Sequence, residues 1–250
     1  MSAVLETHDL CVGYDKPIVE HVNLRIERGE IVALLGGSGS GKSTLLRALT
    51  GLQPPLSGTI KVFGEDLYSL DTDDRNALLR RTGTAFQQDA LFGAMTIADN
   101  VALPLRELTD LPDPIIDEMV RIKLAMVSLH GLDKRLPANL SGGQRKRAAL
   151  ARATALDPEL VFCDEPSAGL DPASAAGIDE TLLRMRDILG ATLVVVSHEL
   201  ESIRTIADRA VMLAGGGVRA EGTIDELEHS NDDDVHAFFH RGATARREYA

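Results

Sequence analysis

The sequence predicts an α/β fold built on a parallel sheet. Three continuous apolar runs support this prediction: "IVALL" (Ile31–Leu35), "LVFCDEP" (Leu160–Pro166) and "TLVVVSH" (Thr192–His198). None of them alternates between apolar and polar residues, which is typical of strands that are buried on both faces. Helical patterns lie between the runs, at residues 45–49 and 178–189, and this alternation of strands and helices indicates the α/β class.

The first sixty residues favour short strands. Runs rich in β-forming residues occupy Val4–Val12, Val22–Ile26 and Gly58–Val62, and glycine, proline and aspartate turn signals separate them. A small β-rich part is therefore expected before and around the parallel sheet.

The middle of the chain, residues 88–140, has a different pattern. It contains three prolines and then the stretch "PIIDEMVRIKLAMVSL", in which apolar residues recur at helical spacing. We interpret it as a mostly helical subdomain inserted in a main domain of residues 1–227. An ordinary crossover helix with a long loop is the alternative.

Residues 228–250 are expected to form a C-terminal extension that is at best partly ordered. This extension contains an acidic run (Asp232–Asp234), the apolar "VHAFF" and then "ARREYA".

Composition limits the classes of function. The chain has 250 residues, of which 44% are hydrophobic and 26% charged, as in an ordinary globular protein, and its net charge is −12. Nucleic-acid binding requires clustered lysine and arginine, so nucleic acid is not an expected partner, and the acidity is explained by solubility. The two cysteines are far apart in apolar surroundings, which favours a reducing compartment.

No targeting or membrane segment is expected. The first ten residues lack the basic stretch and long apolar run of a signal peptide. No apolar run approaches the ~20 residues that cross a bilayer. A soluble protein is therefore expected, with any membrane link made through a partner.

A glycine-rich loop follows the first buried run and predicts a nucleotide site. The stretch "GGSGSGKS" matches the pattern G-x-x-x-x-G-K-[ST] and leads into an apolar-periodic helix. Glycine lets backbone N–H groups approach a phosphate closely, and a helix N-terminus favours an anion. A flexible turn is the alternative. The residues expected to bind the nucleotide are Gly36, Gly37, Ser38, Gly39, Ser40, Gly41, Lys42, Ser43 and Thr44, with Lys42 on the β- and γ-phosphates and Ser43 on Mg²⁺.

Acidic and basic groups end the other two buried runs. Asp164 and Glu165 follow four apolar residues, and two adjacent acids there are costly unless a site uses them. We expect Asp164 to hold Mg²⁺ and Glu165 to polarise the attacking water. A helix N-cap role is the alternative for Asp164. His198 is expected to bond the γ-phosphate, although a lone histidine is more often a capping residue.

A second phosphate-type cradle is predicted at "LSGGQRKRAALARA". Ser141 and two glycines precede a helix rich in arginine, lysine and alanine, so bare amides and a hydroxyl meet at its start. This cradle has no lysine-bearing loop of its own, which raises the possibility that it serves the nucleotide of another subunit.

Together, the segments "GGSGSGKST", "LSGGQ", "LVFCDEP", "SAGLDP" and "VVSHE" resemble the ATPase subunit of an ATP-binding cassette (ABC) transporter over about residues 4–225. The resemblance implies a phosphate-loop ATPase core, an antiparallel β subdomain and an inserted helical subdomain. It also implies a homodimer that sandwiches two ATP molecules between one subunit's phosphate loop and the other's Ser141, Gly142, Gly143 and Gln144.

The same resemblance assigns further residues. Tyr14 matches the aromatic residue that stacks on adenine, although a lone tyrosine could equally be a core or turn residue. Gln87 matches the glutamine that contacts Mg²⁺ and water and senses the membrane partner, with Gln88 as the less favoured choice. Asp171 matches the residue that links the two sites of a dimer. His198 matches the switch histidine, and Gly37 stands where many relatives have proline.

The segments "ALF…MTIADNVALPLREL", "LPDP" and "LSGGQRKRAALARA" resemble, more specifically, the ATPases of Mla and Mce-type phospholipid transporters. Two departures from this pattern are Gln144, where those relatives often have methionine, and "TIADNVALPL", part of which recurs in amino-acid importers.

This resemblance implies a permease, a periplasmic Mce-type lipid-binding subunit, in some cases a small STAS-domain regulator, and a location on the cytoplasmic face of the inner membrane. Phe238 and Phe239 are expected to pack on the neighbouring subunit or on the regulator, with packing on their own domain as the alternative.

Two other functions compete with lipid transport. One is an ATPase of a polar-solute importer, such as an amino-acid importer. The other is a non-transport ABC protein of translation or DNA repair, which would usually carry two cassettes or a long coiled-coil insertion, and neither is evident in this sequence.

Overall fold

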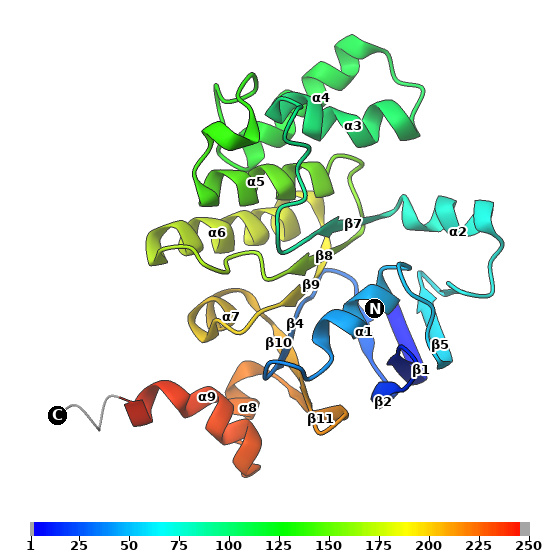
Figure 1. The fold of residues 1–250 in the computed structure, drawn as a ribbon, viewed down its shortest axis with the longest axis vertical. Coiled ribbons are helices and arrows are strands. Elements are labelled where there is room, and N and C mark those ends of the chain that lie inside the picture. Colours follow the sequence, from blue (N-terminus) through cyan, green and yellow to red (C-terminus); the bar gives the residue numbers. More distant parts are fainter. Residues whose placement is uncertain (1–2, 246–250) are drawn as a thin grey trace. The chain divides into compact units, whose positions relative to one another are not determined.

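The computed structural model describes residues 3–245, and these form two compact units (Figure 1). Within the described residues, the first unit combines residues 3–68 with residues 196–245, and the second is Ser69–Val195. Each unit has its own sheet elements and its own helices, so we describe them separately.

An antiparallel sheet occupies the start of the first unit. Its strand order is β2-β1-β5-β6, and β3 pairs with β1 as well. The strands are β1 (Ala3–Gly13), β2 (Pro17–Val22), β3 (Arg25–Glu27), β5 (Ser57–Val62) and β6 (Glu65–Asp66). The antiparallel pairing agrees with the β subdomain implied by the resemblance.

One predicted strand, Val22–Ile26, is wrong. The chain forms two strands there because His21 adopts a left-handed conformation with φ 54° and the backbone leaves the ladder after Val22. The buried Thr7 fills the gap, since its hydroxyl donates to the carbonyl of Val22 at 2.9 Å and accepts from the N–H of Leu24 at 2.8 Å. A left-handed residue and a hydrogen bond to a distant hydroxyl cannot be detected in the apolar and polar pattern from which the strand was predicted.

The first unit also contains strands of the predicted parallel type. They run in the order β11-β10-β4, with β4 (Ile31–Gly36), β10 (Arg209–Ala214) and β11 (Gly217–Gly222). Strands β4 and β10 are parallel, and every residue of β4 is buried, as the run "IVALL" predicted. The helices of this unit are α1 (Lys42–Leu49), α7 (Leu200–Ile206), α8 (Ile224–Glu228) and α9 (Asp233–Ala245).

The second unit has strands in the order β9-β8-β7, namely β9 (Thr192–Val196), β8 (Leu160–Asp164) and the short β7 (Thr82–Ala85). Strands β7 and β8 are parallel. The two apolar runs predicted as buried strands form β8 and β9, and both are largely buried. Its helices are α2 (Thr72–Leu79), α3 (Ile97–Leu108), α4 (Asp113–Met126), the 3-10 turn η1 (Pro137–Asn139), α5 (Gly142–Ala153) and α6 (Pro172–Leu189).

The C-terminal segment corrects a second expectation. Helix α9 packs on its own unit, because Val235, Phe238 and Phe239 join a buried cluster with Leu35 of β4 and Met212 of β10. The two rings meet edge to face, with centroids 5.6 Å apart. Phe238 and Phe239 are therefore core residues and not contacts to a neighbouring subunit. The stretch "ARREYA" lies largely outside the described residues.

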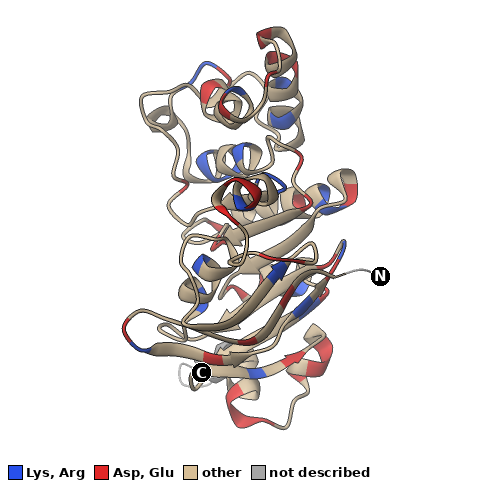
Figure 2. Ribbon diagram, turned by 90° about the vertical axis from the view of Figure 1, so that its right-hand side faces the viewer, with Lys and Arg blue, Asp and Glu red and all other residues tan. Residues whose placement is uncertain are grey.

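The distribution of charged residues over the described part of the chain gives no indication of a nucleic-acid-binding face. Figure 2 shows acidic and basic residues interspersed on the helices and strands, without a segregated basic element. Among residues 3–245, no helix combines the length and the apolarity that a membrane span requires.

Candidate functional site

The glycine-rich loop connects β4 to α1 in the first unit, as predicted. Gly36 has φ +146°, and a Cβ there would lie 2.5 Å from the carbonyl oxygen of Leu213 and from Oγ of Ser40. Gly41 has φ +95°, and its Cβ would lie 2.1 Å from Cγ2 of Val19. Glycine is thus required at both ends of the loop for conformation and for space.

Gly37 differs from these two glycines. Its φ is not positive, and an added Cβ would meet nothing within 4 Å. The position therefore accommodates a side chain.

Lys42 begins α1 and folds back over the loop. Its ammonium group donates to the carbonyl oxygens of Gly36 and Gly37, both at 2.9 Å. Gly41, the N-cap of α1, offers no side-chain cap to the first turn, so this helix start keeps amides for an anion. Ser43 is exposed, whereas Thr44 is buried.

Tyr14 follows β1 and is 55% exposed, which excludes the core alternative. Its hydroxyl accepts a hydrogen bond from Nη1 of Arg47 on α1, at 2.8 Å. The helix that starts at the glycine-rich loop thus also orients the predicted adenine-stacking ring.

His198 is exposed and follows Ser197, which is buried. The N–H of Ser197 bonds the carbonyl of Leu34 on β4 at 3.4 Å. The first unit therefore brings the histidine segment to the strand that leads into the glycine-rich loop.

The second unit brings Gln87, Asp164 and Glu165 to one sheet edge. In the parallel pairing of β7 with β8, Ala85 lies opposite Cys163, so Gln87 and Glu165 each stand two residues beyond paired positions. Asp164 is half-buried at the end of β8, and Glu165 is 9% exposed with φ 50°. The next helix, α6, takes Asp171 as its N-cap, which excludes the N-cap alternative for Asp164.

Sequence reasoning missed Lys146, a buried residue of α5. Its Nζ donates to the backbone carbonyls of Gln87 at 2.9 Å and of Glu165 at 3.3 Å. The signal was present in "LSGGQRKR", because a lysine on the buried side of an alanine-rich helix needs a polar partner.

The predicted second cradle begins α5. Ser141 and Gln144 form a capping box, in which the Ser141 hydroxyl accepts from the N–H of Gln144 and Oε1 of Gln144 accepts from the N–H of Ser141. A Cβ on Gly143 would lie 3.3 Å from Cβ of Ser174, on the first turn of α6. Bonds from Ser174 lower the pKa of Asp171, so this carboxylate stays charged near neutral pH.

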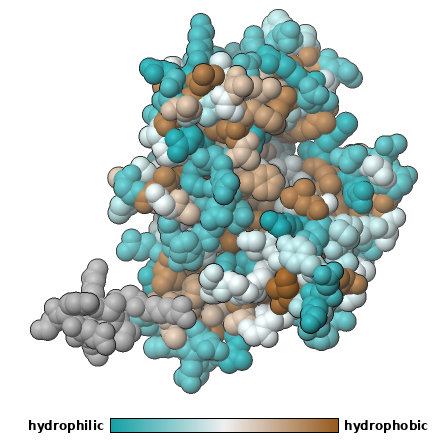
Figure 3. All heavy atoms as spheres, in the orientation of Figure 1, coloured by the Kyte–Doolittle hydropathy of each residue, from teal (hydrophilic) through white to brown (hydrophobic). Residues whose placement is uncertain are grey.

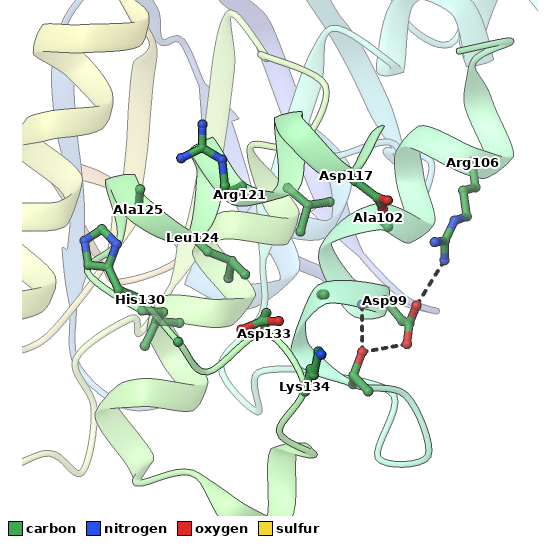
Figure 4. Close-up of a pocket in the computed structure, with 15 residues that line it drawn as sticks. Asp99, Ala102, Arg106, Asp117, Arg121, Leu124, Ala125, His130, Asp133 and Lys134 are labelled. Atoms are coloured by element: carbon green, nitrogen blue, oxygen red, sulfur yellow. Dashed lines mark hydrogen bonds and ion pairs between the residues drawn. The ribbon is translucent and has the colours of Figure 1, made fainter. Parts of the chain in front are cut away.

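A cavity of about 650 Å³ elsewhere in the second unit contains none of the predicted site residues. Figure 4 shows it between α3, α4 and the turn that holds His130 and Lys134, with Asp99 bound to Arg106 and to the N-cap Thr96. It has no glycine-rich loop, so it lacks the features that would hold a nucleotide phosphate.

The residues present fit a nucleotide and a magnesium ion. The glycine positions of the loop leave a cradle that Cβ atoms would fill, next to an uncapped helix start. Among the described residues no group of three or more His, Cys, Asp or Glu side chains could enclose a metal. Magnesium needs only one or two protein carboxylates and otherwise binds phosphates and water, so Asp164 at the end of β8 is a chemically suitable ligand for it.

A buried strand, a glycine-rich loop with its lysine, and a helix start that is open to anions define a phosphate-loop nucleotide-binding protein. Comparison with known proteins gives the family. The family model described as "ABC transporter" matches residues 19–168, more than half of the chain. The chain therefore belongs to the ABC transporter family and is an ATPase of the ABC type.

Two groups of relatives resemble the chain over most of its length. The intermembrane phospholipid transport system ATP-binding protein MlaF of Haemophilus influenzae is 42% identical over 218 residues, which are 87% of this chain and 83% of the relative. MlaF of Escherichia coli K12 is 40% identical, covering 88% and 82%. The probable ribonucleotide transport ATP-binding protein mkl of Mycobacterium tuberculosis is 42% identical, covering 85% of this chain and 60% of the relative.

Among solved structures, a dimeric post-hydrolysis state of the ATP-binding cassette MJ0796, bound to ADP and Pi, superposes with a TM-score of 0.81. It is 30% identical, and the match covers 88% of this chain and 98% of that one. The predicted fold class is thereby confirmed.

Proposed function

We propose that this chain is the Mg²⁺-dependent ATPase subunit that powers a phospholipid ABC transporter between the inner and outer membranes. The supporting observation is its 40–42% identity to MlaF proteins over 87–88% of the chain. The names of the MlaF proteins state phospholipid transport, and the glycine-rich loop that starts α1 in this chain supports a nucleotide-driven role.

The phosphate contacts are proposed for Gly36–Thr44. Backbone N–H groups of the loop and Lys42 hold the β- and γ-phosphates, and Lys42 exchanges its two carbonyl partners for phosphate oxygens. Tyr14 stacks on the base, in the orientation that Arg47 sets.

Hydrolysis is proposed to depend on Glu165 as the general base. Its carboxylate takes a proton from water, while Gln87 orients that water and His198 bonds the γ-phosphate. Ser43, Asp164 and Gln87 are the proposed protein ligands of Mg²⁺, which when bound would neutralise charge on the phosphate oxygens.

The functional assembly is proposed to be a homodimer of cassettes. Ser141–Gln144 would contact the partner's nucleotide, and Asp171 would link the two sites; the dimeric form of MJ0796 supports this arrangement. Ser141→Arg, a bulky cation at an exposed helix start, should block ATP-induced dimers on size-exclusion chromatography while leaving ATP binding intact. Unchanged dimer formation would refute the role of the Ser141 segment.

A groove beside the Gln87 segment is the proposed docking surface for the permease. It has a volume of about 560 Å³ and is lined by polar and apolar residues of α2, β7, α3 and α5, the large apolar ones including Phe86, Pro104 and Leu108. Phe86 is 40% exposed and Leu108 39%, although both are large and apolar. Figure 3 shows apolar side chains among polar ones over the helices of this unit.

This docking would hold the chain on the cytoplasmic face of the inner membrane as a peripheral subunit. A periplasmic Mce-type lipid-binding subunit and a small STAS-domain regulator are further proposed partners. A nucleic-acid partner is not proposed, since the net charge is −12.

The experiment that tests the proposed function is mass spectrometry of the complex that co-purifies with this chain from mild detergent. A multi-span permease, an Mce-type subunit and enriched phospholipid are expected. A permease with a soluble solute-binding protein and no enriched lipid would instead identify a polar-solute importer. That second candidate is favoured by the 36% identity to the methionine import ATP-binding protein MetN 2 of Pseudomonas syringae.

A further inference from the structure

Lys146 lies on the buried side of α5, with 8% of its surface exposed. A buried ammonium group loses its hydration, and the loss is offset only by charged or well-aligned polar partners. The partners of Lys146 are therefore informative about what the residue does.

Those partners are the backbones of two proposed catalytic loops. The Nζ atom donates to the carbonyl of Gln87 at 2.9 Å and to that of Glu165 at 3.3 Å, and it lies 3.7 Å from Oδ1 of Asp89. The two hydrogen bonds of this ammonium group connect the segment after β7 to the segment after β8, and the ion pair with Asp89 adds to the first of these.

The backbone is in an uncommon conformation at Glu165 and close to Gln87. Glu165 has φ 50°, and Asp89 and Ala90 have φ 60° and 50°, all left-handed for residues other than glycine. Such conformations cost free energy and persist only where the surroundings hold them. The Cα–Cβ direction of Glu165 follows from this backbone, so a bond to its carbonyl helps to set the point from which its side chain extends.

Helix α5 supplies two further cations to the segment after β7. Arg152 donates to the carbonyl of Ala90 at 2.7 Å and to that of Asp89 at 3.2 Å, and Arg145 lies 3.5 Å from Oδ2 of Asp89. Of these three cations, Lys146 is the one that also bonds the carbonyl of Glu165.

We propose that Lys146 is a positioning residue for ATP hydrolysis. It ties the backbone of Glu165 to that of the Gln87 loop, so that movement of the Gln87 loop is transmitted to the general base. This inference rests on the proposed roles of Glu165 and Gln87. It adds Lys146 to the residues that support hydrolysis, and so links α5, whose N-cap is Ser141, to the general base.

The competing explanation is that Lys146 contributes to folding alone. Replacement of a residue of that kind would lower the melting temperature and the active fraction, but not kcat per folded molecule. Replacement of a positioning residue lowers kcat while the affinity for ATP stays unchanged, because displacement of the base by about 1 Å costs roughly 10²-fold in rate.

The test compares Lys146→Met and Lys146→Arg with Lys123→Met in the full-length chain assembled with its permease. Lys123 is a matched control, since it is also buried in the second unit, at 4% exposure, but pairs with the carboxylate of Asp157. Each variant is measured for kcat, KM, fluorescent-ATP affinity and melting temperature.

The proposal expects Lys146→Met to lower kcat by about 10- to 100-fold at unchanged ATP affinity. Lys146→Arg, which keeps a cationic donor for both carbonyls, should regain most of the rate. Lys123→Met should lose stability and keep its kcat. If Lys146→Met does not fold, Lys146→Gln, which keeps an amide donor, is expected to show the same split in milder form.

Three results would overturn the proposal. They are an unchanged kcat in Lys146→Met, an equal loss in Lys123→Met, and a kcat loss that follows the melting temperature in every variant. A wild-type chain that binds ATP and does not hydrolyse it would refute the ATPase mechanism itself, and the inference with it. The wild-type control thus separates the two failures.

Discussion

Replacement of Phe239 by alanine tests whether α9 is part of the protein's core. Phe239 is 3% exposed and packs in the cluster with Leu35 of β4 and Met212 of β10. Truncation of this ring removes its apolar contacts and leaves a cavity, because the flanking strands are held in place by their own hydrogen bonds.

The expected loss is large for one side chain. Burial of a phenylalanine to this extent is typically worth about 3–5 kcal/mol when the ring is cut back to alanine. In a protein of this size, 1 kcal/mol shifts the melting temperature by about 2–4 °C, so Phe239→Ala should lower it by roughly 6–20 °C.

The assay is thermal unfolding of the purified chain followed by circular dichroism. Phe92→Ala is the matched control, because Phe92 is 52% exposed and its truncation should stay within about 0.5 kcal/mol, or roughly 2 °C. Equal shifts in the two variants would refute the reasoning, since α9 would then contribute no more to the core than an exposed ring does.

Three further predictions concern the site. Glu165→Gln should bind ATP and lose ~10²–10⁴-fold in turnover, since the water lacks its base; near-normal single-turnover rates would place the base elsewhere. Gly41→Ala should weaken ATP binding by about tenfold or more, because the new Cβ would lie 2.1 Å from a methyl group of Val19. The φ of +95° at residue 41 adds backbone strain of about 1–3 kcal/mol. Gly37→Ala, where a Cβ meets nothing within 4 Å, should bind ATP normally in the same titration, and equal losses would contradict the geometry. Burial, and then the nearby Asp164, raises the pKa of the Cys163 thiol to about 12, so iodoacetamide at pH 8 should leave Cys163 unlabelled in the native chain and label it after denaturation. Rapid labelling of this thiol in the native chain, read by peptide mass spectrometry, would show that Cys163 is accessible to solvent and contradict its burial in β8.

The sequence predicted the buried strands and the glycine-rich loop well, for a physical reason. The runs that became β4, β8 and β9 are apolar without alternation, and a strand covered on both faces requires that pattern. Gly36 and Gly41 could be assigned because no other residue fits their conformations. These features are local, so local patterns were enough to find them.

What the sequence missed depends on contacts between distant segments. The division between β2 and β3 depends on the hydroxyl of Thr7, fifteen residues before its partner Val22. Phe238 and Phe239 could equally serve a core or an interface, and only their partners decide between the two. Lys146 was missed because its bonds reach residues 59 and 19 positions away along the chain.

The fold-back of Lys42 onto the glycine-rich loop has a consequence for the entropy of nucleotide binding. A free lysine side chain loses up to about 2 kcal/mol of rotamer entropy when it is ordered. Here that ordering is already achieved during folding, by two neutral carbonyl acceptors. A nucleotide therefore meets a cation whose position the loop carbonyls already help to fix. Affinity for a polyphosphate is raised through preorganisation, while a ligand without negative charge gains nothing from displacing the same two bonds.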